Sequence, residues 1–380
     1  GSVIRLGGNE TGFHLSQTEL DAIVTSGSVS FGGDVTALIV VDSVRVVDNA
    51  ATVSLVASMT ASSAIEFVGE ASSFATEASV NSRGTVTVAA ALSSTARLVL
   101  VADSDCDGAG EFVVTASGSV GTPAEVVVRS AGVSWSGVLD ASVSAVTFGV
   151  CEGVSMGLGG VSGAEAFYLS QADLDALASA ATARVTFETV SGSVTMYDLE
   201  YLANDIEVNA STVSVVGSMN VAGLSAFVGA DIVISANVSA SDSVSVQATS
   251  IDVDADVWLT AVGGVVSLDA ADIRSASPTW WLAGDGIVVA GPLEITGAGT
   301  WAVDADTDVD GVGSVSFASS ASVSVSSASV SRLEITGAGV ALPNSVAANT
   351  AEVAFESSGS VNGSVIRLGG NETGFHLSQT

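Results

Sequence analysis

The chain alternates apolar and small polar residues over many short stretches. One such stretch runs from Val312 to Val330, and shorter ones are Thr85–Val88, Glu125–Val128 and Ser243–Val246. A period of two places successive side chains on opposite faces, so each stretch predicts a half-buried β-strand. Glycine, serine, asparagine and aspartate separate the stretches and predict turns. The pattern therefore predicts an all-β chain of many short strands.

A helical period is confined to two short segments, residues 16–25 and 170–180. In the first, Ser16 stands where it can cap a helix, and Glu19 stands where it can close a capping box. We interpret both segments as a single helical turn or short helix at one corner of the fold, with a coil as the alternative.

Eighteen residues at the start of the chain, Gly1–Thr18, recur letter for letter at Gly363–Thr380, 362 positions later. Strand pairing constrains the pattern of a sequence and not its letters, so this identity indicates tandem duplication of a 362-residue unit. An older duplication is visible inside the unit, because Leu15–Ile23 (LSQTELDAI) returns at Leu169–Leu177 (LSQADLDAL). The sequence predicts three parts: a first half-repeat at 1–154, a longer second half-repeat at 155–362, and the start of the next identical repeat at 363–380.

Two further echoes refine this division. Phe67-Val68-Gly69 matches Phe227-Val228-Gly229, 160 positions later. Leu293–Gly299 (LEITGAG) returns at Leu333–Gly339, 40 positions later, which we interpret as two turns of about 20 residues each.

Repeats on several scales are typical of a stack in which each turn contacts only its neighbours. A parallel β-helix, or β-solenoid, is favoured over an array of β-sandwiches, because sandwich domains of about 100 residues would repeat at that spacing with proline-rich linkers. At about 20 residues per turn and roughly 4.8 Å between stacked strands, the repeat would be a rod of about 18 turns and about 90 Å.

Part of the repeat resembles a known family. Leu6-Gly7-Gly8, the segment Phe13–Ile23 and the strand Gly27–Gly32 resemble repeats of very large bacterial surface proteins of the filamentous haemagglutinin type. The Glu19-Leu20-Asp21 core is kept, the residues before it depart from the family pattern, and Asp173-Leu174-Asp175 is a weaker copy. The resemblance covers about thirty residues in each half-repeat. It implies a right-handed parallel β-helix, an extracellular or cell-surface location, and adhesion or fibre formation.

Charge narrows the choice of partners. The chain has 41 acidic and 9 basic residues, a net charge of −32, yet 48% of its residues are hydrophobic. The hydrophobic content predicts a folded chain. The charge excludes a nucleic-acid partner, because few cationic side chains are present to neutralise phosphates. No window holds 18 consecutive apolar residues, so no membrane insertion is expected in this segment. The expected partners are adjacent copies of the same repeat and neighbouring filaments.

Two segments of the form Asp-x-Asp-x-Asp-Gly offer alternating carboxylates at a turn. They begin at Asp103 and Asp306, and their carboxylates belong to Asp103, Asp105, Asp107, Asp306, Asp308 and Asp310. Such carboxylates suit a hard cation, so structural calcium is a candidate, and no other cofactor is expected. The twelfth positions are Val114 and Phe317 rather than glutamate, so neither segment is an EF-hand, and a solvated acidic loop is the competing interpretation.

Two cysteines and five asparagines are candidates for covalent modification. Cys106 and Cys151 are too few for a disulfide framework but could form a single disulfide. Asn-x-Ser/Thr triplets would accept glycans if the source is eukaryotic and secretory; they lie at Asn9, Asn209, Asn237, Asn362 and Asn371.

These features favour a structural repeat unit of an extracellular filament, surface fibre or adhesin stalk, without catalysis. A carbohydrate-binding adhesin module is the first alternative, because four tryptophans of the second half-repeat could stack on sugars or fill the core: Trp258, Trp280, Trp281 and Trp301. A polysaccharide-degrading β-helix enzyme is the second alternative. The absence of lysine and the single histidine position per repeat, His14 and its copy His376, argue against it.

Overall fold

The computed structural model is a parallel β-solenoid of about 14 turns, with 61% of the chain in strands and 4% in helices. The residues described are 2–8, 12–45, 50–140, 142–160, 165, 167–177, 184–343, 345–348, 352–357, 366–368 and 375–379. The all-β parallel solenoid expected from the sequence is confirmed. Asn9, Asn362 and Asn371 lie outside the described residues.

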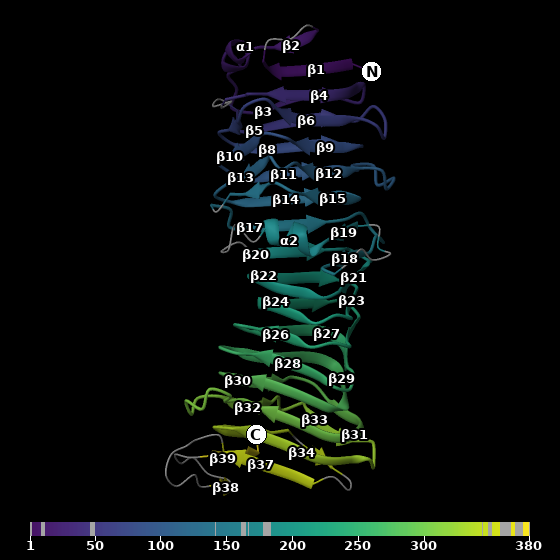
Figure 1. Cartoon of the computed structure of the whole chain (residues 1–380), viewed down its shortest axis with the longest axis vertical. Coiled ribbons are helices and arrows are strands. Elements are labelled where there is room, and N and C mark those ends of the chain that lie inside the picture. The colour runs from purple at the N-terminus through teal and green to yellow at the C-terminus, as the bar shows by residue number, and fades with distance from the viewer. Residues whose placement is uncertain are drawn as a thin grey trace. The chain divides into compact units, whose positions relative to one another are not determined.

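The chain divides by packing into two compact units, Gly1–Gly192 and Ser193–Thr380. Figure 1 shows the strands of each unit stacked one turn upon the next. The sequence boundaries at 154/155 and 362/363 are boundaries of duplication rather than of packing, and they stay predictions.

The first unit contains two short helices and twenty strands over its described residues. Their bounds are β1 Ser2–Gly7, β2 Phe13–Leu15, α1 Gln17–Asp21, β3 Ser28–Gly33, β4 Thr36–Asp42, β5 Thr52–Ala57, β6 Ala64–Val68, β7 Ser72–Phe74, β8 Glu77–Ser82, β9 Thr85–Val88, β10 Ala91–Ser94, β11 Leu98–Val101, β12 Glu111–Val114, β13 Ser119–Gly121, β14 Glu125–Arg129, β15 Gly132–Trp135, β16 Val138–Leu139, β17 Ala145–Gly149, β18 Met156–Leu158, β19 Phe167–Leu169, α2 Gln171–Leu177 and β20 Arg184–Glu188.

Three parallel stacks form the sides of the first unit. One stack runs β2-β1-β4-β6-β9-β12-β15, a second runs β3-β5-β8-β11-β14-β17-β20, and a third runs β7-β10-β13-β16. Among the described residues, the first two sides have seven strands each and the third has four, so only some turns contribute a strand to the third side. The core lies between the three sides.

The second unit contains nineteen strands over its described residues. Their bounds are β21 Ser193–Met196, β22 Leu199–Ala210, β23 Thr212–Val215, β24 Met219–Val228, β25 Asp231–Ile234, β26 Val238–Ala240, β27 Val244–Val253, β28 Val257–Ala261, β29 Val265–Ala283, β30 Gly286–Val289, β31 Leu293–Asp304, β32 Ser314–Phe317, β33 Ser322–Val325, β34 Val330–Gly337, β35 Gly339–Leu342, β36 Ser345–Ala347, β37 Glu352–Ser357, β38 Ile366–Leu368 and β39 Phe375–Gln379.

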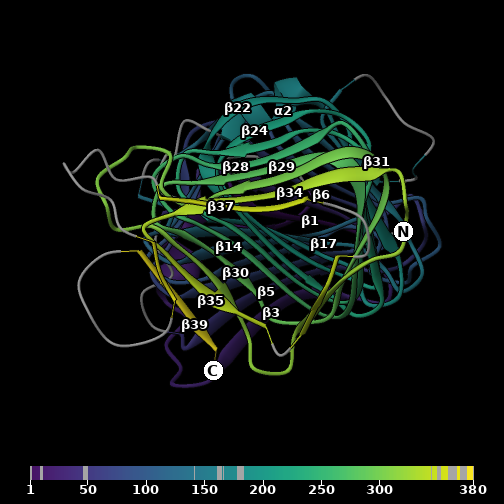
Figure 2. The same cartoon turned by 90° about the horizontal axis from the view of Figure 1, so that it is seen from below.

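Several strands of this unit are long because they bend around a corner and serve more than one side. β29 pairs with β28 and β30 through its two ends and with β27 and β31 along most of its length. Viewed along the stack, β34 and β37 lie on one side of the unit, while β35 and β39 lie on another (Figure 2).

The alternation seen in the sequence becomes alternation of burial. Thr52–Ala57 alternates between half-buried and buried positions, with Val53, Leu55 and Ala57 inside. Thr85–Val88 is strand β9 in full, as predicted. The stretch Val312–Val330 is not one strand: it contains β32 and β33, separated by turns, and ends at the first residue of β34.

Aromatic side chains fill the core of the first unit between β12 and β20. Phe148 pairs in register with Phe187, and their rings stack with centroids 5.8 Å apart. The ring centroid of Phe148 also lies 6.3 Å from that of Trp135 and 6.4 Å from that of Phe167. All four side chains are buried, so Phe148 is the centre of an aromatic cluster that ties together β15, β17, β19 and β20.

The length of a turn is where the sequence prediction was wrong. Val213 pairs with Ile232, and Leu98 pairs with Val126, so successive rungs are separated by unequal lengths of chain. The separation is longest where Val146 pairs with Val185, because the segment between them includes β18, β19 and α2. The chain therefore makes about 14 turns rather than 18. In that longest segment the extra residues are partly strand, because β18 and β19 pair with each other in parallel.

The 40-residue echo is likewise not two turns. Leu293 pairs with Val323, and Leu333 pairs with Trp301, so the two LEITGAG copies lie on different sides of the solenoid. The Phe-Val-Gly echo also fails as a structural match, because Phe67 is buried and Phe227 is 46% exposed. A shift of one residue in a strand turns every side chain to the opposite face, and identity over three letters does not prevent it.

The older duplication is reproduced in three dimensions. Ser16 caps α1 and closes a capping box with Glu19, as predicted. In the second copy the backbone N–H of Ser170 donates to the Asp173 carboxylate, and Asp173 also accepts a hydrogen bond from the backbone of Trp135, 2.9 Å away. Aspartate thus replaces glutamate in the box and anchors α2 to β15.

Backbone atoms crowd around Gly313 and leave no room for a side chain. A Cβ atom added to Gly313 would lie 1.5 Å from the carbonyl oxygen of Ala305 and 2.6 Å from that of Gly284. We expect Gly313→Ala to destabilise the second unit by about 3 kcal/mol, because backbone must move to admit the methyl group. Gly229→Ala is the matched control, with its nearest neighbour at 3.8 Å. Urea unfolding followed by circular dichroism would check this, and equal midpoints for the two variants would contradict it.

Candidate functional site

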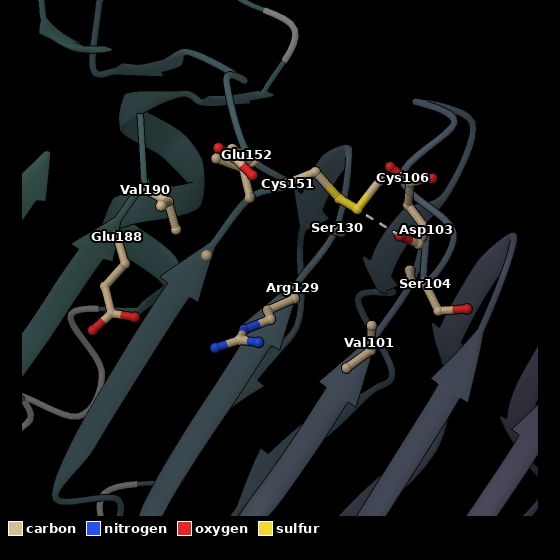
Figure 3. Close-up of a pocket in the computed structure, with 13 residues that line it drawn as sticks. Val101, Asp103, Ser104, Cys106, Arg129, Ser130, Cys151, Glu152, Glu188 and Val190 are labelled. Carbon is tan, nitrogen blue, oxygen red and sulfur yellow. Dashed lines mark hydrogen bonds between the residues drawn. A yellow bond between two sulfur atoms is a disulfide. The ribbon is translucent and has the colours of Figure 1, made fainter. Parts of the chain in front are cut away.

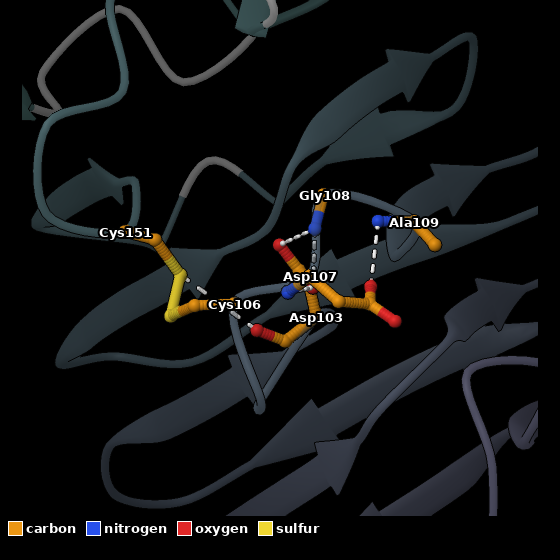
Figure 4. The surroundings of a disulfide bond; sticks show 6 residues. All are labelled: Asp103, Cys106, Asp107, Gly108, Ala109 and Cys151. Carbon is orange, nitrogen blue, oxygen red and sulfur yellow. Dashed lines mark hydrogen bonds between the residues drawn. A yellow bond between two sulfur atoms is a disulfide. The ribbon is translucent and has the colours of Figure 1, made fainter.

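The acidic turn that follows β11 is held by its own first carboxylate. Asp103 is only 4% exposed, and its side chain accepts hydrogen bonds from the backbone N–H groups of Asp107 (2.9 Å) and Gly108 (3.2 Å). Asp107 in turn accepts from the N–H of Ala109 at 2.9 Å (Figure 4). Burial raises the pKa of the Asp103 carboxyl, and the N–H of Gly108 opposes that shift. The first aspartate of the pattern is therefore a structural residue of the turn.

The second acidic turn, after β31, has the same geometry. Asp306 is buried and accepts from the N–H groups of Asp310 (3.1 Å) and Gly311 (3.2 Å), and Asp310 accepts from Val312 at 2.8 Å. Burial also raises the pKa of the neighbouring Asp304 carboxyl. Two distant parts of the sequence, one in each unit, thus build the same loop type.

Each turn brings its three carboxylates together. Asp103, Asp105 and Asp107 place carboxylate oxygens within 4.8 Å of one another, and so do Asp306, Asp308 and Asp310; in each set the first residue is buried and the other two are exposed. Calcium takes six to eight oxygen ligands, so three carboxylates would supply part of a coordination shell. The buried carboxylates of Asp103 and Asp306 already accept hydrogen bonds from backbone N–H groups. These hydrogen bonds explain their burial without a bound ion. Calcium binding at both turns stays a prediction.

A disulfide distinguishes the first turn from the second. Cys106 and Cys151 are joined, with Cα atoms 5.7 Å apart, and Cys151 Sγ lies 3.8 Å from the carbonyl oxygen of Asp103 (Figure 4). Val309 occupies the position of Cys106 in the second turn, and both residues have positive φ, 60° and 58°. The disulfide links the corner after β11 to the corner after β17.

A pocket of about 310 Å³ lies beside this disulfide (Figure 3). Arg129, Gly149 and Glu188 are neighbours on three successive rungs. Because the middle rung has no side chain, a hollow opens there, and Arg129 leans over it: a Cβ on Gly149 would lie 3.2 Å from Arg129 Cγ. Glu152 and the disulfide complete the rim.

The pocket combines one guanidinium with carboxylates and contains no histidine among its lining residues. His14 lies elsewhere in the first unit, in β2, where its Nε2 is 2.6 Å from the carbonyl oxygen of Gly7. That contact holds the Leu-Gly-Gly turn, so the described imidazole has a structural role. Sequence reasoning missed the pocket because Arg129 and Glu188 are far apart in the chain, and only the unequal turn lengths bring them together.

The tryptophans of the second unit divide into two pairs. Trp281 and Trp301 are buried edge to face, with ring centroids 5.0 Å apart. Trp258 and Trp280 stack on the surface, with centroids 4.8 Å apart, and Trp258 is 41% exposed. The backbone N–H of Trp258 donates to the Oδ1 of Asn237, an exposed sequon residue. The other described sequon residue, Asn209, donates to Glu207 at 3.1 Å.

Fold and sites together define the chain as a β-solenoid repeat protein. No family model, curated protein or solved structure matches it. Neither described helix has the length and apolar character needed to cross a bilayer.

Proposed function

We propose that the chain is a structural repeat unit of a giant extracellular filament, surface fibre or adhesin stalk of the filamentous haemagglutinin kind. One observation carries the proposal. The described strands of the duplicated segment pair alike at both places: Ile4 pairs with Phe13 in β1 and β2, and Ile366 pairs with Phe375 in β38 and β39. This likeness, together with the pairing of β39 with β35, supports a next copy that continues the parallel fold.

Two further features support a stalk rather than a catalyst. Within each unit, hydrogen-bond ladders with buried columns of Val, Leu and Ile resist bending, because the described strands pair in parallel with those of neighbouring turns. The net charge of −32 keeps neighbouring filaments apart at low ionic strength.

Electron microscopy of a protein built from several 362-residue units tests the proposal. The chain makes about 14 turns, so at roughly 4.8 Å per turn we expect an axial repeat of about 67 Å for each 362-residue repeat in a thin rod. Compact particles, or beads joined by visible linkers, would contradict a continuous filament.

A carbohydrate-binding adhesin module is the second candidate, favoured by the exposed stack of Trp258 and Trp280. Flat aromatic faces suit the apolar face of a sugar ring. Glycan-array binding that is lost in Trp258→Ala would support it. The third candidate, polysaccharide degradation, would be placed at the pocket around Arg129, and turnover of an acidic polysaccharide would reveal it.

A further inference from the structure

The C-terminal end of the second unit displays how the repeated segment docks. β39, which has the same letters as residues 13–17, pairs in parallel with β35. Val340 lies opposite Leu377, Ala341 opposite Ser378, and Leu342 opposite Gln379. The counterparts of these three partners at the start of the chain are Leu15, Ser16 and Gln17.

At the start of the chain the same segment has an open edge. β2 pairs with β1 on one side, and on its other side no strand of the described residues pairs with it. Phe13 is 63% exposed, and Leu15 is half-buried. An edge strand with unpaired backbone and exposed apolar residues is a template for another strand.

The column of buried side chains that ends at Val340 and the column that ends at Leu15 face the core in the same register. In the second unit, Ile287, Val315 and Val340 form a buried column on successive rungs. In the first unit, a column of the same kind consists of Leu15, Leu6, Val41 and Phe67, and all but Leu15 are buried. Placing Leu15 opposite Val340 would join both columns without a change of face, which a shift of one residue would prevent.

We propose that the open edge of β2 is a docking surface for β35 of a second copy of this chain, with Leu15 opposite Val340 and Gln17 opposite Leu342. In the 1–380 chain, β39 already pairs with the edge of β35 that the second copy would use. The inference rests on the proposed function, since it describes the joint between successive units. A joint of this kind is head to tail and does not close, so it propagates.

A chain shortened to residues 1–362 tests the joint. Its β35 edge is free, so we expect its weight-average mass in sedimentation and light scattering to rise with concentration, whereas the 1–380 chain stays monomeric. A synthetic peptide of residues 363–380 should suppress the association. Phe13→Glu in the shortened chain should weaken it, and Val190→Glu, at an exposed valine far from β2 in the sequence, should leave it unchanged. A folded shortened chain that stays monomeric would overturn the proposal.

A cross-link in a protein of two 362-residue units tests the register even if the shortened chain does not fold. Ala341→Cys in the first copy and Ser16→Cys in the second should form a disulfide under mild oxidation, because paired parallel strands lie within its reach. Ala341→Cys with Val24→Cys in the second copy should not. If microscopy shows an axial repeat but the cross-link fails, the joint is wrong and the filament stands; if both fail, both proposals fall.

Discussion

Replacing Phe148 with alanine is expected to destabilise the first unit by about 3 to 5 kcal/mol. The side chain is fully buried, and its ring contacts Trp135, Phe167 and Phe187, so truncation removes buried area and leaves a cavity between these aromatic rings. Neighbouring rungs hold the strands in place, which prevents collapse around the void. Denaturant unfolding followed by tryptophan fluorescence would measure the loss.

Phe13→Ala is the matched control, because it removes the same atoms from a ring that is largely in solvent. Its effect on the 1–380 chain should stay within about 0.5 kcal/mol. Similar losses for the two variants would contradict the placement of Phe148 at the centre of the aromatic cluster.

Removing the disulfide should lower the stability of the first unit by about 2 to 4 kcal/mol. Cys106 and Cys151 are 45 residues apart, and cross-linking a loop of this length removes many conformations from the unfolded chain. The double variant Cys106→Ser/Cys151→Ser should therefore unfold at lower denaturant concentration, while the spectrum of the folded state stays that of a β-protein.

Reductant supplies the control for this comparison. It should shift the unfolding of the original chain to that of the double variant and leave the variant unchanged. If reductant leaves the original chain unchanged, the two cysteines are not joined; an effect on the cysteine-free variant would show that the reductant acts by another route.

The sequence predicts local structure well wherever a residue's neighbours in the chain decide its conformation. Alternation placed β9 correctly, and the Ser16 and Glu19 pair marked the capped start of α1. Both signals are local: one depends on the two-residue pleat, and the other on the free backbone donors of the first helical turn.

The sequence also contains enough information to predict which tryptophans face the core and which face the solvent. Trp280 and Trp281 are adjacent in one strand, so one must face the core and the other the surface. The Val257-Trp258-Leu259 alternation likewise turns Trp258 outward. Without the phase of each strand, both roles stayed open for all four residues, stacking on sugars or filling the core.

The position of a residue along the stack could not be predicted. Whether two copies of a short motif lie two turns apart or on different sides depends on the corner loops between them, and these loops carry no periodic signal. That is why the pocket of Arg129, Gly149 and Glu188 was missed, and why the burial of Asp103 and Asp306 inside exposed-looking acidic turns was missed as well.

The disulfide has a mechanical consequence for the first unit. Hydrogen bonds between parallel rungs point along the stacking direction, so tension in that direction loads them in series, and the weakest rung opens first. Cys106 follows β11 and Cys151 follows β17, with β14 between them, so the covalent link carries load in parallel with two successive rung interfaces. Under tension the disulfide would bear the force in place of the hydrogen bonds of those two interfaces. Separation of turns that begins on either side would therefore stop at the disulfide.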